Sequence, residues 1–122
     1  MEYLFMWTVV YEQPFEDWFL SLSIAEKRDI LAVVKVLQIE GSRLGRPYVD
    51  TLKGSKLKNL KELRVQHQGN PYRILFVFDP KRQAVLLCGG NKTNDKRFYE
   101  RMILIAEQSY QCYLAQQDKT NE

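Results

Sequence analysis

The chain has 122 residues, of which 45% are hydrophobic, 12% aromatic and 27% charged. This length fits one domain, and the apolar content is sufficient for a folded core, which excludes a disordered protein. Apolar stretches such as Ile74 to Phe78 are far shorter than the roughly 20 residues of a membrane span, and Glu2 stands where a signal peptide carries basic residues. The sequence therefore predicts one cytoplasmic domain over residues 1–122 that does not enter a membrane.

The net charge of +3 conceals an uneven distribution along the chain. Between Arg43 and Arg101 there are 14 Lys and Arg against 5 Asp and Glu, whereas the two flanks hold 4 against 10. Lys and Arg are common on any soluble surface, so scattered solvating charges are one interpretation. The excess in the middle nevertheless favours a polyanionic partner.

Cysteine and histidine are too sparse for a metal site or a disulfide framework. Cys88 and Cys112 lie 24 positions apart without a CxxC pair, and His67 is the single histidine of the sequence. We expect His67 to be a solvent-facing loop residue. No metal or cofactor is expected.

The amino-terminal part predicts a strand followed by two helices. Tyr3 to Tyr11 is rich in aromatic and β-branched residues, and because it is almost wholly apolar we expect a central strand of a sheet. Pro14 suits the first turn of a short helix. Ser23 and Glu26 have the spacing of a capping box, so a longer helix begins there and stops at Gly41.

The middle of the chain predicts an antiparallel meander. Residues 42–58 contain glycine, proline and basic residues without periodicity, which indicates an irregular connection in which functional residues could lie. Three apolar runs follow, separated by turn signals: Leu60 to Gln66, Tyr72 to Phe78 and Ala84 to Cys88. The fold class is therefore α+β, with a compact, mainly antiparallel sheet.

A last helix is predicted after the meander. Gly89 and Gly90 indicate a tight connection that also suits an anion, and Thr93 or Asn94 can cap the helix. The polar tail over residues 116–122 is expected to fray.

Arg73 is the charge that most requires an explanation. Strand alternation places Leu63 and Val65 on one face and Glu62 and Arg64 on the other, whereas Arg73 interrupts an otherwise apolar strand. One interpretation is a surface arginine paired with Glu62 across strands. The other is a rigid phosphate clamp, because a guanidinium offers bidentate donors.

Metal-free RNA cleavage requires a base for the 2′-hydroxyl, stabilisation of the phosphorane and a proton for the 5′-oxygen. A single histidine excludes a two-histidine design, so Lys, Arg, Tyr and Glu side chains would have to do this chemistry. Tyr99 can point toward the sheet or pack in the core, and position alone does not decide between the two.

These segments together resemble a known toxin family. The resemblance is carried by Leu60-Lys61-Glu62-Leu63-Arg64-Val65, by Pro71-Tyr72-Arg73-Ile74-Leu75-Phe76-Val77-Phe78-Asp79-Pro80, by Ala84-Val85-Leu86-Leu87, and by Gly90-Asn91-Lys92 leading to Tyr99. Over roughly residues 3 to 110 the chain resembles the phage-derived, HigB-like branch of the RelE/ParE toxin superfamily. The resemblance implies a RelE-like sheet with two amino-terminal helices and one carboxy-terminal helix. It also implies a ribosome-dependent messenger-RNA endonuclease and a helix-turn-helix, HigA-like antitoxin as partner.

Carried over by position, the family's site falls on four residues: Arg64, Arg73, Lys92 and Tyr99. By this resemblance Arg73 holds the scissile phosphate, Arg64 and Lys92 neutralise developing charge, and Tyr99 orients groups or transfers a proton. Further RNA contacts are expected from exposed cations: Lys53, Lys56, Lys58, Lys61, Lys96 and Arg97.

Two departures from the family pattern leave the base and the acid open. Glu62 and Thr93 stand where related toxins often carry basic residues. Two other functions stay possible from the sequence: a non-catalytic, ParE-like gyrase poison, and a basic RNA-binding module.

Overall fold

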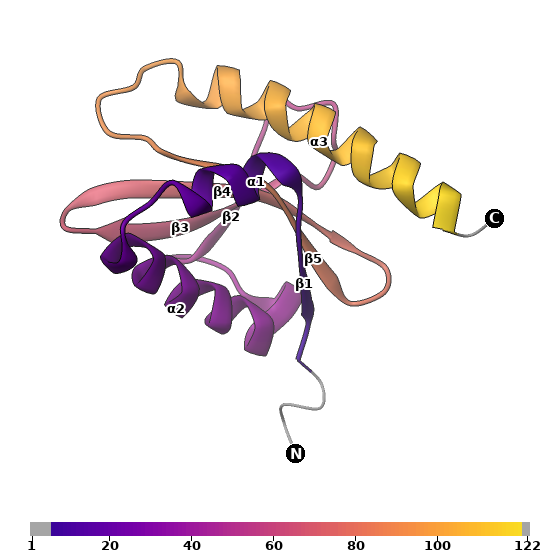
Figure 1. Ribbon diagram of the computed structural model, residues 1–122, viewed down its shortest axis with the longest axis horizontal. Coiled ribbons are helices and arrows are strands. Elements are labelled where there is room, and N and C mark those ends of the chain that lie inside the picture. The colour runs from indigo at the N-terminus through magenta and orange to yellow at the C-terminus, as the bar shows by residue number, and fades with distance from the viewer. Residues whose placement is uncertain (1–5, 121–122) are drawn as a thin grey trace.

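The computed structural model describes the backbone of residues 6–120 and the side chains of residues 6–119. In this part of the chain, five strands form one sheet: β1 (Thr8–Tyr11), β2 (Val49–Thr51), β3 (Lys61–His67), β4 (Asn70–Asp79) and β5 (Gln83–Asn91). The helices are α1 (Gln13–Leu20), α2 (Ile24–Glu40), a short 3₁₀ turn η2 (Gly41–Arg43) and α3 (Phe98–Thr120). Helices α2 and α3 lie on opposite sides of the sheet (Figure 1). The predicted α+β class and the meander are confirmed.

The strand order is β1-β5-β4-β3-β2, with β1 parallel to β5 and the other pairs antiparallel. The prediction of a central strand over Tyr3 to Tyr11 is wrong. The strand begins at Thr8 and lies at the edge, and Tyr3 to Phe5 lie outside the described residues. Its apolar character has another cause, because Val9 and Val10 of this strand pack against apolar clusters on opposite faces of the sheet.

The two amino-terminal helices form for the reasons read from the sequence. Ser23 accepts a hydrogen bond from the Glu26 amide, and Glu26 accepts one from the Ser23 amide, so the capping box is confirmed. Helix α2 ends at Gly41, which has φ of 59°. A Cβ atom there would lie 1.9 Å from Trp7 Nε1, so only glycine fits.

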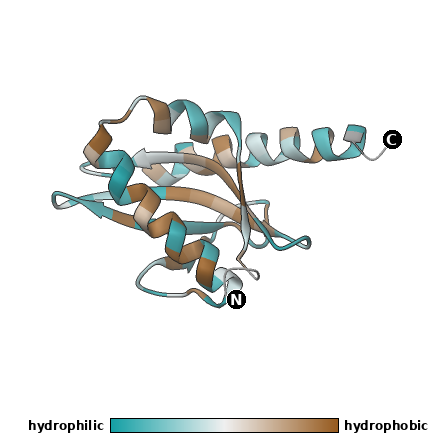
Figure 2. Ribbon diagram, turned by 60° about the horizontal axis from the view of Figure 1, so that its bottom comes forward, coloured by the Kyte–Doolittle hydropathy of each residue, from teal (hydrophilic) through white to brown (hydrophobic). Residues whose placement is uncertain are grey.

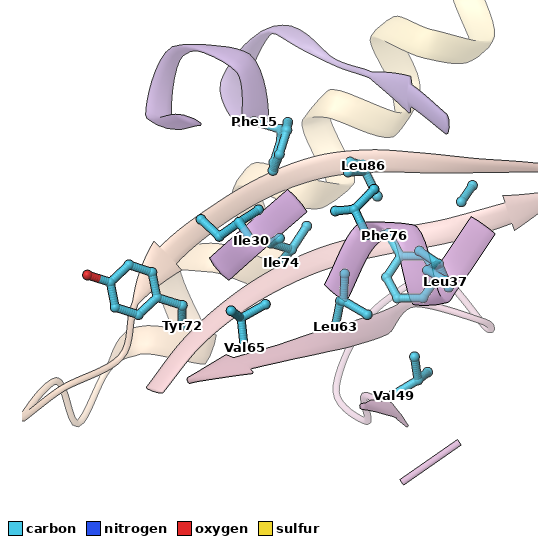
Figure 3. Packing of buried hydrophobic residues seen from close by; sticks show 12 residues of the cluster. Phe15, Ile30, Leu37, Val49, Leu63, Val65, Tyr72, Ile74, Phe76 and Leu86 are labelled. Carbon is cyan, nitrogen blue, oxygen red and sulfur yellow. The ribbon is translucent and has the colours of Figure 1, made fainter. Parts of the chain in front are cut away.

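The sheet buries an apolar cluster on each face. Helices α1 and α2 cover the first cluster, and Figure 3 shows side chains of β3 and β4 pointing toward Ile30 and Leu37 of α2 and toward Phe15 of α1. Helix α3 covers the second, which includes Leu75, Phe98 and neighbouring residues. In Figure 2 the central strands are brown through the middle and teal at the hairpin tips. This double burial explains why β4, the middle strand, is apolar on both faces.

The irregular connection over residues 42–58 contains a strand that the sequence did not predict. Strand β2 has three residues and pairs with the start of β3, Val49 opposite Leu63. Three residues are too few to show an alternating pattern. Beyond Leu63, no described strand lies beside β3 on this side.

The carboxy-terminal region differs from the sequence prediction in two respects. Gly89 and Gly90 lie inside β5 rather than in a turn. Helix α3 begins at Phe98 and not near Asn94, whose φ of 55° is incompatible with a right-handed helix. Helix α3 continues to Thr120, and the expected fraying of the tail stays a prediction. The Tyr113 hydroxyl anchors its outer half by donating to Asp79 Oδ2 at 2.5 Å.

Strand β5 also contains a bulge. Leu75 pairs with Cys88 but Phe76 pairs with Leu86, so Leu87 is an extra residue without a partner in the β4 register. Val85, Leu87 and Cys88 consequently all contribute to the cluster under α3. None of the helices in residues 6–120 combines the length and the apolarity that crossing a membrane requires.

Candidate active site

Two arginines lie directly opposite each other in the centre of the sheet. Arg64 of β3 pairs with Arg73 of β4, and directly paired residues of antiparallel strands project to the same face. That face is the one covered by α3, because Leu75 and Val77, on the same side of β4, belong to its cluster. The two guanidinium groups therefore lie on the same face of the sheet.

Glu62 holds the two arginines together. Its Oε2 lies 3.4 Å from Arg64 Nη1, and its Oε1 lies 3.5 Å from Arg73 Nε. Only 3% of Glu62 and 3% of Arg73 are exposed, so this is a buried ion pair. Arg73 Nη1 also donates to the Tyr72 carbonyl at 3.0 Å, but Nε makes no hydrogen bond to any described residue. The site thus contains two positive guanidinium groups and one internal carboxylate.

Tyr99 reaches this carboxylate from α3. Its hydroxyl donates to Glu62 Oε1 at 2.5 Å, which answers the question that the sequence left open. Burial and then the hydrogen bond to Glu62 raise the pKa of Tyr99 above its ordinary value, while Arg73 lowers it in part. The Lys92 ammonium lies 5.1 Å from the centre of the Tyr99 ring, a cation–π distance. All four predicted catalytic residues therefore converge on one face of the sheet, together with Glu62.

The glycines of β5 allow this convergence. Gly90 is the partner of Arg73 in the β4–β5 register, and a Cβ atom there would lie 2.9 Å from Phe98 Cε1. The missing side chain lets the first turn of α3 approach the sheet, so the next residue, Tyr99, comes within reach of Glu62. Gly89 serves the other face, where a Cβ atom would lie 2.4 Å from Trp18. The glycines are explained by packing and not by a turn.

The exposure of the site residues is unequal. The Arg64 side chain is 28% exposed, compared with 3% for Arg73. A hollow of about 470 Å³ opens beside Arg64 and is lined by Val33, Arg46, Pro47, Tyr48, Arg64 and Gln66. The sequence-based role of Arg73 as the clamp on the scissile phosphate does not fit this burial. Arg64 is the guanidinium that solvent reaches.

The additional cations are distributed around the site. Lys53, Lys56 and Lys58 are exposed on the connection between β2 and β3. This connection is fixed to α3, because Ser55 Oγ and the Lys56 amide both donate to Glu107 Oε2, at 2.8 and 2.7 Å. These three lysines therefore border the α3 face.

The remaining predicted RNA contacts divide between the two faces. Lys96 and Arg97 are exposed in the turn just before α3. Lys61, by contrast, alternates with Glu62 and shares the opposite face with Leu63, where its Nζ donates to Thr51 Oγ1 at 3.0 Å. The structure does not bring Lys61 together with the arginines.

Histidine and cysteine do not take part in the cluster. His67 is buried, not solvent-facing as expected, because its Nδ1 lies 2.6 Å from Asp29 Oδ2 of α2 on the other face. Burial raises the pKa of the Cys88 thiol to about 12, so this cysteine is a poor nucleophile at neutral pH. Within residues 6–120 there is no group of three His, Cys, Asp or Glu side chains that could hold a metal ion.

Glu62 is the site residue that sequence reasoning did not include. The sequence showed it as a possible cross-strand partner of Arg73 and as a departure from the family pattern, and the structure confirms the pairing but buries it. A usable signal was present, because the period of two already placed its side chain on the face of Arg64.

Comparison with known proteins identifies the family of this chain. Residues 17–111 match the family described as phage-derived protein Gp49-like. The chain belongs to this family. Two curated relatives of the Gp49-like chain come from Mycobacterium tuberculosis. Putative toxin HigB3 is 45% identical over 101 residues, covering 82% of this chain and 87% of the relative. Putative toxin HigB2 is 40% identical over 116 residues, covering 93% of this chain but only 57% of the relative.

Two solved structures share the fold of the Gp49-like chain. One is a double arginine-to-alanine mutant of the Escherichia coli toxin RelE in the free state, with a TM-score of 0.55 and 9% identity, covering 78% of this chain and 93% of RelE. The other is the archaeal RelE–RelB complex of Pyrococcus horikoshii, with a TM-score of 0.53 and 19% identity, covering 73% and 98%. The RelE-like fold and the HigB-like relationship expected from the sequence motifs are confirmed.

Proposed function

We propose that this Gp49-like protein is the toxin of a type II toxin-antitoxin system and inhibits translation by cutting messenger RNA on the ribosome without a metal ion. Two observations support the proposal. The curated relatives at 45% and 40% identity are named as putative toxins. In addition, Arg64, Arg73 and Tyr99 surround one carboxylate on a single face of the sheet. The convergence of these side chains is the observation that carries the enzymatic part.

The roles follow from burial and contacts. Arg64, the more exposed of the two arginines, binds the scissile phosphate and stabilises the charge that develops on it. Its contact with Glu62 Oε2 is long, at 3.4 Å, so a phosphate that draws Arg64 away leaves this oxygen free. Glu62 is as buried as Arg73 in the free protein, so in this scheme the movement of Arg64 must first uncover Oε2; Glu62 then accepts the proton of the 2′-hydroxyl, and Arg73 keeps the carboxylate in place.

Tyr99 supplies the proton for the leaving group in this scheme. The 2′-oxygen attacks phosphorus, the bond to the 5′-oxygen breaks, and the 5′-oxygen takes the phenolic proton, which leaves a 2′,3′-cyclic phosphate. A raised pKa keeps Tyr99 protonated at neutral pH, as a proton donor must be. Lys92, near the Tyr99 ring, stabilises the phenolate that forms for a moment.

Purified protein incubated with ribosomes and messenger RNA tests the proposal. We expect cut transcripts that end in 2′,3′-cyclic phosphate, the product of attack by the 2′-oxygen and not by a metal-activated water. Arg64→Ala should slow cutting by roughly 10²- to 10³-fold, the usual effect of losing one charge-stabilising donor. Arg43→Ala is the matched control, because Arg43 is an exposed arginine paired with Glu40, and it should cut normally.

Two results would point elsewhere. Intact transcripts together with trapped DNA breaks would favour a gyrase poison. Tight, salt-sensitive RNA binding without any cut product would favour a non-catalytic RNA-binding module.

The partner we propose is a small antitoxin with a helix-turn-helix domain. The archaeal neighbour was solved as a RelE–RelB complex, and the HigB-like relationship favours a HigA-like partner. Co-expression with the product of the adjacent reading frame should yield a stable complex and remove RNA cutting. Failure of every neighbouring product to bind would refute this part alone.

A further inference from the structure

We propose that the hollow beside Arg64 is a nucleobase pocket, which holds the base next to the phosphate bound at the active site. The position of the phosphate rests on the proposed function. The pocket itself rests on its own lining and can be tested without any RNA cutting.

The hollow has the size of a small-ligand site and is open to solvent on one side. Its volume of about 470 Å³ lies within the range of roughly 300–1,000 Å³ that is usual for such pockets. Three separate segments form its walls: Val33 of α2, residues 46–48 of the connection, and Arg64 with Gln66 of β3. The opening exists because β2 ends opposite Leu63, so no described strand covers the edge of β3 at Gln66.

The lining has the chemistry that single-stranded RNA requires. Tyr48 is 37% exposed and offers an aromatic face on which a base can stack. Val33 and Pro47 add apolar surface. The exposed Gln66 carries an amide with both donors and an acceptor, which can read the edge of a base.

The walls of the pocket are held by hydrogen bonds. The Tyr48 carbonyl accepts from the Arg64 amide at 2.7 Å, and the Tyr48 amide donates to Gly45 at 3.0 Å. Arg46 Nη2 lies 2.7 Å from Asp50 Oδ2, which fixes the cation at the rim. A stacking platform that is already ordered loses little conformational freedom when a base binds.

Arg64 connects the pocket to the active site. Arg64 lines the hollow, and its Nη1 contacts Glu62. A phosphate bound by this guanidinium therefore has Glu62 on one side and the hollow on the other. A nucleotide bound through its phosphate would place its base against Tyr48 and Gln66, so these two residues select the base at the cutting site.

Binding of nucleoside 5′-monophosphates to the full chain, measured by calorimetry or NMR titration, tests the pocket. We expect at least one of the four common ribonucleotides to bind more tightly than inorganic phosphate. Tyr48→Ala should weaken this binding about tenfold, the range of one lost base–aromatic stack, while Tyr48→Phe retains it. Gln66→Ala should reduce the differences among the four bases. Arg43→Ala, at an exposed arginine outside the hollow, should bind as the native protein does.

The proposal is overturned if no nucleotide binds better than inorganic phosphate, or if Tyr48→Ala binds nucleotides as tightly as the native protein. If Tyr48→Ala does not fold, unchanged base preference in Gln66→Ala overturns the assignment on its own. Native nucleotide binding without cut messenger RNA would refute the proposed function but support the pocket. Normal cutting of messenger RNA without selective nucleotide binding would support the proposed function but refute the pocket.

Discussion

Glu62 and Arg73 face each other from neighbouring strands while both are almost fully buried, with Glu62 Oε1 3.5 Å from Arg73 Nε. Removing two charges from water costs several kcal/mol each, and their mutual attraction offsets this cost only when both are present. The pair therefore makes the stability of the sheet depend on the same carboxylate that we place in the reaction.

Glu62→Gln keeps the shape of the side chain and removes its charge. We expect the free energy of unfolding to fall by about 3–5 kcal/mol, because Arg73 is then a buried cation without a counter-charge. Denaturant unfolding followed by circular dichroism measures the change. Glu40→Gln removes a carboxylate from an exposed pair with Arg43 and should change stability by less than about 1 kcal/mol. Equal effects of the two substitutions would mean that burial of the Glu62 pair has no energetic consequence.

Tyr99→Phe removes one hydroxyl from the active site. The loss of the proton donor should slow RNA cutting by roughly 10²-fold or more, whereas the fold should persist because the ring remains. Tyr110→Phe is the matched control, since Tyr110 lies on the same helix and stacks on Tyr113 away from Glu62. Cutting at the native rate by Tyr99→Phe would remove Tyr99 from the mechanism.

Gly89→Ala tests the packing explanation for the glycines. The new methyl group would lie 2.4 Å from the Trp18 ring, so α1 must shift away from β5, and we expect a loss of about 1–3 kcal/mol. Gly45→Ala introduces the same methyl group where nothing lies within 4 Å, and should be nearly neutral. Thermal melting of the two variants side by side gives the comparison. A neutral Gly89→Ala would show that Trp18 moves freely.

The hydrogen bond from Tyr72 to Glu26 predicts a pH dependence of stability. This bond is the main cause that lowers the pKa of Glu26, and burial with the same bond raises the pKa of Tyr72 to about 12. A lowered carboxyl pKa contributes stability above its unfolded value of 4.5, which is lost as the pH falls through the folded value. A raised phenol pKa contributes stability that is lost as the pH rises from 10 toward 12.

Tyr72→Phe should therefore be less stable than the native protein between about pH 5 and pH 9, and the difference should shrink outside this window. Denaturation midpoints of both proteins from acid to alkaline pH provide the measurement. Tyr11→Phe, at an exposed tyrosine, should follow the native curve throughout. A constant difference across the acid range would mean that Glu26 is not the partner that matters.

Local patterns in the sequence predicted the elements but not their order in the sheet. The alternation in β3 and β4 and the capping box at Ser23 depend on neighbouring residues, so they could be read directly. The edge position of β1 depends on its pairing with β5, more than 70 residues away, which no local pattern records. Strand β2 was missed because three residues carry no periodic signal.

The active site was predictable to the same extent. The common face of Arg64 and Arg73 follows from strand alternation and the hairpin register. The burial of Arg73 could not be predicted in this way, because it depends on how closely α3 packs over Gly90. The pocket at Tyr48 lies in a connection without periodicity, so the sequence could indicate this region but not its individual functional residues.

The single extra residue in β5 has an effect that extends beyond the strand. Before Leu87 the odd-numbered residues face α3, and after it the even-numbered residues do, including Gly90. Deleting Leu87 would exchange the face covered by α1 and the face covered by α3 for the rest of the strand, turning Gly90 away from Phe98 and redirecting the segment that leads to Lys92. The extra residue Leu87 thus determines which face the end of β5 presents to α3, and so whether the Lys92 ammonium reaches the Tyr99 ring.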